Sequence, residues 1–122
     1  TKRHVQVDWI WETGQWTMRR LLMVPPGHYD VVYEINPWMN REVRASREVT
    51  TAQWDALFRL LTEVLGAEVL LTEPKEGLPE PALAENAGVV RGCTNVLSNF
   101  RHPERQGEAP HFARWFESYG FE

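Results

Sequence analysis

Prolines interrupt an otherwise apolar run over residues 24–39, and this run constrains the fold more than any other part of the chain. Pro25 and Pro26 fix their φ angles and lack backbone N–H donors, so a strand that reaches them has to end there. Pro37 ends the following apolar segment in the same way, directly after Asn36. A buried amide is costly unless it has hydrogen-bond partners. We therefore expect Asn36 to be held by its own turn or by a ligand.

The composition indicates one globular domain and excludes several classes of partner. The chain has 122 residues, a formal net charge of −4 and a pI of about 5.6, with no block of lysine or arginine. Neither nucleic acid nor an anionic membrane is therefore expected as a partner. No apolar stretch approaches the roughly 18 residues of a spanning helix, and no signal-peptide pattern opens the chain. We expect a cytoplasmic protein.

Cysteine and histidine give no sign of a disulfide framework or a metal centre. Cys93 is the one cysteine, which excludes an internal disulfide and fits a reducing compartment. The four histidines show no metal-ligand spacing among themselves or with Cys93. The sequence predicts no metal site.

Hydrophobic periodicity and turn signals predict alternating strands and helices. The alternation within residues 4–24 predicts a hairpin, and the polar segment 40–49 is typical of a solvated connection. Thr50 and Gln53 form a capping-box pattern at the start of a helix that Gly66 ends. The remaining predicted elements are a strand at 68–72, a loop at 73–85, strands at 86–91 and 95–100, and a helix that opens at Pro110 and ends at Gly120.

Three motifs follow one another along the chain. They are Ile35-Asn36-Pro37-Trp38-Met39, then Gly77-Leu78-Pro79-Glu80 with Asn86-Ala87-Gly88, and finally the run from Val96 to Glu108. Together they resemble the motifs of the amidinotransferase-type guanidine-modifying enzymes, a superfamily that includes arginine dihydrolases, dimethylargininases and arginine deiminases. The first motif is most similar to the dihydrolase branch. The resemblance covers about residues 19–120.

The resemblance implies an α/β fold that is part of a five-module propeller of ββαβ units around a substrate cavity, the pentein-like architecture. Residues 19–122 would be the N-terminal portion of this propeller domain, with about one complete module and the start of a second. Residues 1–18 would be an N-terminal extension that forms a strand of a hairpin.

An incomplete propeller implies apolar surfaces that need a neighbour. We expect contact with the remainder of the same enzyme, or self-association. The residues expected on these surfaces are Phe112, Trp115, Phe116 and Tyr119 near one end and Trp9, Trp11 and Trp16 near the other.

The resemblance also implies covalent catalysis by a cysteine thiolate, with a histidine that transfers protons and an acidic residue that orients it. All three would lie beyond residue 122, so we expect the isolated chain to be inactive. Cys93 does not stand at the nucleophile position of the family and is expected to be a structural or incidental thiol. This mechanism requires no cofactor.

Two asparagines are candidate substrate-binding residues. By resemblance, Asn36 helps to form the substrate pocket, and the alternative is a turn amide bonded to its own backbone. Asn86 matches a family residue that contacts the substrate guanidinium, and the alternative is a turn residue that precedes a strand.

Two charged residues complete the candidate site. Glu80 stands where the family usually has an aspartate that binds the guanidinium, and the alternative is a solvated loop acid. Arg105 matches the arginine that clamps the substrate α-carboxylate, for which a guanidinium offers a bidentate fork. The alternative for Arg105 is a surface ion-pair ladder with Arg101, Glu104 and Glu108, which would contribute little.

Taken together, these features predict the substrate-binding N-terminal portion of a hydrolase or transferase that acts on the guanidino group of arginine or an analogue. The alternative is a non-catalytic arginine-sensing or assembly subunit built on a partial propeller. A small guanidino compound such as arginine is the expected ligand in both cases.

Overall fold

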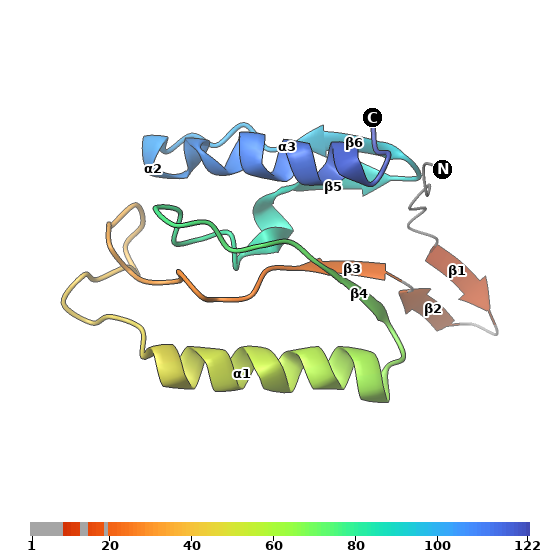
Figure 1. Cartoon of the computed structure of the whole chain (residues 1–122), viewed down its shortest axis with the longest axis horizontal. Coiled ribbons are helices and arrows are strands. Elements are labelled where there is room, and N and C mark those ends of the chain that lie inside the picture. Colours follow the sequence, from red (N-terminus) through yellow and green to blue (C-terminus); the bar gives the residue numbers. More distant parts are fainter. Residues whose placement is uncertain (1–8, 13–14, 19) are drawn as a thin grey trace.

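The computed structural model describes residues 9–12, 15–18 and 20–122. Strands β1 (Trp9–Glu12) and β2 (Gln15–Met18) pair antiparallel, with Trp11 opposite Trp16 (Figure 1). Both strands lie within the hairpin predicted over residues 4–24. The part of that prediction that falls on residues 4–8, and the side chains of Trp9, Trp11 and Trp16, lie outside what the structure describes.

The second strand of the predicted hairpin does not continue to residue 24. Strand β3 (Arg20–Met23) instead pairs with β4 (Glu68–Leu71), and the pair is parallel, with Arg20 opposite Glu68. A parallel pair needs a long crossover connection, and helix α1 (Arg47–Arg59) supplies it. The helix continues as a π-helical turn, η1 (Leu60–Val64), and ends before Gly66, whose φ of +66° suits glycine.

The predicted N-cap of this helix is wrong. Ser46, not Thr50, is the N-cap, because its side chain accepts a hydrogen bond from the Val49 backbone N–H at 3.3 Å. Residues 47–49, predicted as solvated connection, form the first turn of α1. Serine and threonine are both good N-cap residues, and the cap that satisfies the first free N–H groups of the helix lies one turn earlier than predicted.

Strands β5 (Gly88–Arg91) and β6 (Thr94–Leu97) form an antiparallel hairpin. It is preceded by the 3₁₀ turn η2 (Ala84–Asn86), so Asn86 lies before the strand that was predicted to include it. The helix predicted to open at Pro110 begins earlier, as α2 (Pro103–Gln106) followed by α3 (Glu108–Ser118). Pro110 lies in the first turn of α3, where a missing N–H costs no helical hydrogen bond.

The core lies between β3 and α3, not against α1. Its buried residues include Val24, Ala87, Phe112, Phe116 and Phe121. In Figure 1, α1 and α3 lie on opposite sides of β3 and β4.

The predicted apolar flank on the last helix is therefore wrong in part. Phe112 is fully buried and Phe116 is 7% exposed, while Trp115 and Tyr119 are partly buried against the same core. The apolar surface lies instead on α1 and η1, in which no residue is buried and Leu57, Leu60 and Val64 are exposed.

Among the described residues, no helix is long and apolar enough to cross a membrane.

Candidate functional site

Arg105 lies at the centre of a buried ion cluster. It projects from α2 and is 8% exposed, and Glu108, the first residue of α3, is fully buried. The Glu108 carboxylate accepts hydrogen bonds from Nε and Nη2 of Arg105, both at 2.8 Å. Burial opposes the charged form of Arg105, but the hydrogen bond and charge of Glu108 raise its pKa above the ordinary value. Arg105 and Glu108 are therefore a buried bidentate pair and not members of a surface ladder.

Glu80 is the second carboxylate of the cluster. It comes from the proline-rich loop before η2 and places Oε2 2.9 Å from Nε of Arg105. Glu80 is 6% exposed, so it is not a solvated loop acid. Burial raises the pKa of its carboxyl group, and the charge of Arg105 offsets only part of that rise. When both carboxylates are ionised, these three side chains carry a net negative charge.

Asn86 joins the cluster from η2. Its Oδ1 accepts a hydrogen bond from Nη1 of Arg105 at 2.9 Å, and its side chain reaches the surface. The Asn86 N–H donates to the Leu83 carbonyl at 3.1 Å, and the Ser98 hydroxyl donates to the Asn86 carbonyl. Asn86 is thus fixed through its backbone and oriented through its side chain.

Asn36 does not contact this cluster within the described part of the chain. Its Oδ1 accepts hydrogen bonds from the backbone N–H groups of Trp38 and Met39, at 3.0 and 3.1 Å. Asn36 is exposed, and Trp38 at the tip of the same turn is 88% exposed. In this structure Asn36 serves as a turn amide, the alternative reading of its motif.

Two aromatic residues of the cluster were not predicted. The Phe100 ring lies 4.5 Å from the guanidinium carbon of Arg105, a cation–π distance. The Tyr33 hydroxyl is buried with no hydrogen-bond partner among the described residues. Burial, followed by the charges of Glu80 and Glu108, raises the pKa of Tyr33 well above its usual value. Tyr33 lies three residues before Asn36, and only this proximity to a motif could have indicated it.

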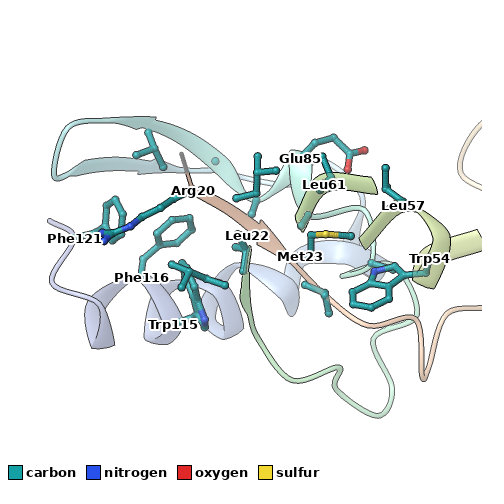
Figure 2. Close-up of a pocket in the computed structure, with 18 residues that line it drawn as sticks. Arg20, Leu22, Met23, Trp54, Leu57, Leu61, Glu85, Trp115, Phe116 and Phe121 are labelled. Atoms are coloured by element: carbon teal, nitrogen blue, oxygen red, sulfur yellow. The ribbon is translucent and has the colours of Figure 1, made fainter. Parts of the chain in front are cut away.

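A separate apolar cavity of about 490 Å³ lies between α1 and α3 (Figure 2). Trp54, Leu57 and Leu61 line it from the α1 side, with Phe116 and Phe121 on the other side. None of the four predicted site residues lines this cavity. It therefore belongs to the packing of α1 and not to the polar cluster.

The free cysteine is not among the residues of the cluster. Cys93 is an exposed free thiol in the turn between β5 and β6. Within the described ranges there is no group of three histidine, cysteine, aspartate or glutamate side chains that could hold a metal ion.

Comparison with known proteins identifies relatives that extend well beyond this chain. No protein-family model matches the chain. The bifunctional arginine dihydrolase/ornithine cyclodeaminase AgrE of Nostoc sp. is 48% identical over 103 residues, which cover 84% of this chain and 14% of that protein. The N(G),N(G)-dimethylarginine dimethylaminohydrolase of Mycobacterium tuberculosis is 39% identical over 103 residues, which cover 84% of this chain and 34% of that protein.

A solved structure shares the fold. The N-terminal domain of ArgZ, an arginine dihydrolase from the ornithine–ammonia cycle in cyanobacteria, matches with a TM-score of 0.78 and 45% sequence identity. That crystal structure contains a variant in which one cysteine is replaced by serine, bound to substrate. The match covers 84% of this chain and 38% of the ArgZ domain. The chain thus spans well under half the length of the relatives described.

Proposed function

Because this chain belongs to the superfamily of guanidine-modifying enzymes and corresponds to an N-terminal portion of them, we propose that it forms the substrate-binding part of an enzyme acting on the guanidino group of arginine or an analogue. The enzyme would be a hydrolase or an amidinotransferase.

The observation that supports this function most strongly is the convergence of three motif residues. Glu80, Asn86 and Arg105 come from separate segments, yet both Glu80 and Asn86 lie 2.9 Å from nitrogens of Arg105. Glu108 and Asn86 engage one N–H on each of the three guanidinium nitrogens. A second N–H on Nη1 and on Nη2 has no acceptor among the described residues and is available to a substrate carboxylate. Asn36 would contribute its side-chain N–H groups, because its Oδ1 already accepts hydrogen bonds from its own turn.

The catalytic groups would lie outside these residues. A covalent mechanism needs an activated thiolate, a proton-transferring base and a group that orients the base. The one cysteine, Cys93, lies in a hairpin turn and is not part of the cluster. The thiolate would attack the guanidino carbon, and the departing amine would take its proton from the base.

The fold supports the proposal that the chain is about one module of a five-module propeller and the start of the next. The Glu122 N–H donates to the Cys93 carbonyl at 2.9 Å, and the Asn95 N–H donates to the Glu122 carbonyl at 2.7 Å. Glu122 is thus bonded to both neighbours of Thr94 in the chain. This is the hydrogen-bond pattern of two parallel strands. A further strand that begins at Glu122 would thus lie parallel to β6. The exposed apolar side chains of α1 would contact the remainder of the enzyme or a second copy.

The carboxylate clamp can be tested in a chimera, in which this chain replaces the aligned segment of the ArgZ N-terminal domain. We expect Arg105→Lys to weaken arginine about ten- to a hundredfold more than agmatine, which lacks the carboxylate. Lysine keeps the charge but loses the planar fork. Calorimetric titration of both ligands measures this difference, and Arg101→Lys is the matched control because Arg101 is exposed. Equal losses for the two ligands would show that Arg105 acts only through the fold.

A further inference from the structure

We propose that the edge of β3 opposite to β4 binds one β-strand with apolar side chains on both faces, supplied by the part of the enzyme outside this chain. The strand would pair antiparallel to β3 and fill the apolar cavity between α1 and α3 (Figure 2). The inference rests on the proposed function for the source of the strand, which is the remainder of the same enzyme.

One edge of β3 is paired, and the other has no neighbouring strand within the described ranges. There β3 belongs to a two-stranded sheet with β4. The Met23 carbonyl accepts a hydrogen bond from the Thr72 N–H at 3.2 Å, so Met23 and, two residues earlier, Leu21 direct their backbone groups toward β4. The N–H and C=O of Leu22 therefore point to the opposite edge. An edge of this kind is a template for a further strand.

The cavity reaches around this second edge. Successive side chains of a strand point to opposite faces, so the side chain of Leu22 lies on the face opposite to those of Leu21 and Met23. All three side chains line the cavity. A cavity that contacts both faces of one strand has to pass around one of its edges, and the edge paired with β4 is closed. The cavity therefore runs along the edge to which Leu22 directs its backbone.

Both walls of the cavity are apolar. On one side lie Trp54 and Leu57 of α1 and Leu61 of η1, and on the other side lie Phe116 and Phe121 (Figure 2). A strand placed beside β3 would present one row of side chains to each wall. Both rows would therefore be apolar, as in a strand that is covered on both faces, and its sequence would be a continuous run of valine, isoleucine or leucine.

The N-terminal segment of this chain has an unsuitable sequence for the cavity. Residues 4–8 alternate polar and apolar side chains. If they formed a strand, one row would consist of His4, Gln6 and Asp8. Placing that row against an apolar wall would bury polar groups without partners, which is costly. A strand from outside the chain is therefore the better occupant.

The direction of the strand follows from the second half of the chain. There β6 is followed by α3 and then by Glu122, whose hydrogen bonds to β6 have the parallel pattern. Strand β5 pairs with β6 in the antiparallel direction. The elements β3, α1 and β4 repeat this order, because they also form a parallel pair joined through a helix. The second edge of β3 thus corresponds to the edge of β6 that β5 occupies, so the strand expected there is antiparallel.

The first part of the test measures backbone hydrogen exchange in the ¹⁵N-labelled full chain, residues 1–122. The N–H groups of Leu21 and Met23 should be protected by β4, and the N–H of Leu22 should exchange about tenfold faster or more. Protection of Leu22 that rises with protein concentration would identify a second copy as the occupant. Protection that does not depend on concentration would identify a segment of the same chain. Either result would overturn the proposal.

The second part adds a probe peptide, Ile-Val-Val-Ile-Val between two pairs of lysines. At saturation it should slow exchange at Leu22 about tenfold or more. A control peptide with threonine at every second apolar position has one apolar face and should bind about tenfold more weakly or worse. A nitroxide on the C-terminus of the probe should broaden the signal of Arg20 more than that of Val24, as antiparallel pairing requires. Equal affinities, the reverse broadening or no protection of Leu22 would each contradict the proposal.

A matched pair of variants shows whether the peptide occupies the cavity. Leu57 lines the cavity and is 48% exposed, whereas Val64 is 72% exposed and does not line it. Both positions are accessible to water, so we expect both variants to fold. Leu57→Glu should weaken the probe peptide about tenfold or more, because it places a charge against the bound strand, and Val64→Glu should change binding less than about twofold. Equal effects would place the peptide elsewhere and overturn the proposal.

The chimera with the ArgZ domain tests the source of the strand. In the folded chimera the N–H of Leu22 should be protected without any peptide, and exchange as fast as in the isolated chain would overturn the proposal. None of these measurements depends on turnover. A failure of the arginine-hydrolysing function alone would therefore appear as a chimera in which Leu22 is protected but no ammonia is released.

Discussion

Replacing Arg105 with methionine is expected to lower the free energy of unfolding of this chain by about 3–5 kcal/mol near neutral pH. The substitution leaves Glu80 and Glu108 facing each other in a buried site without the cation that both contact. Burial raises the folded pKa of Glu80 above its unfolded value, so its ionisation destabilises the fold as the pH rises through the folded pKa. The loss should therefore shrink as the pH falls and Glu80 is protonated. Urea unfolding followed by circular dichroism measures the change.

Two further variants show whether this effect comes from the buried charges. Arg101→Met removes an exposed arginine and should change stability by no more than about 0.5 kcal/mol. Adding Glu80→Gln and Glu108→Gln to Arg105→Met removes both stranded charges and should restore a large part of the lost stability. A loss below about 1 kcal/mol for Arg105→Met, or no recovery in the triple variant, would show that the cluster is not the buried network described here.

Phe112→Ala is expected to cost about 3–5 kcal/mol of unfolding free energy. Phe112 is fully buried and belongs to the core cluster with Phe116 and Phe121. Its removal leaves a cavity in the packing between α3 and β3, in addition to the lost transfer free energy. The same urea unfolding assay measures the effect, with the variant and the parent chain at equal concentration.

Val64→Ala is the control for the helix on the opposite side. Val64 is 72% exposed in η1, so its truncation should change the stability of the chain by no more than about 0.5 kcal/mol. The opposite ranking, with a small loss for Phe112→Ala and a large loss for Val64→Ala, would mean that α1 carries the core and α3 the exposed face.

The sequence motifs predict much of the polar site. Glu80 and Asn86 were identified from the second motif and Arg105 from the third, and the structure brings all three together. Motifs do not reveal which hydrogen-bond donors and acceptors of these residues are used within the cluster. The spacing of Arg105 and Glu108 allows an ion pair, but the burial of that pair depends on tertiary packing. The burial of the Tyr33 hydroxyl depends on the same packing.

Element boundaries show the same limit. Ser46 and Thr50 lie one helical turn apart, and either could cap a helix that contains the same apolar positions. Pro103 and Pro110 are likewise both compatible with a first helical turn. Which cap forms depends on the path of the connection after residue 39, and ion pairs of Arg41 and Arg44 with the preceding loop hold that path.

The choice of buried helix was also beyond local pattern. Both helices have apolar residues at helical spacing, but only α3 packs against the core that includes Val24 and Ala87. The helix α1 covers the other side of the parallel pair and keeps its apolar residues exposed or lining the cavity. Periodicity identifies an apolar face but not its partner.

If this chain holds the substrate while other residues perform the chemistry, purified residues 1–122 will release no ammonia, citrulline or ornithine from arginine. The chimera with the ArgZ domain will release ammonia from arginine, and Asn86→Ala or Arg105→Lys will reduce that release. Ammonia release from arginine by both proteins, side by side, is the most direct measurement. Turnover by the isolated chain that Cys93→Ser abolishes, or a folded chimera without activity, would contradict the assignment.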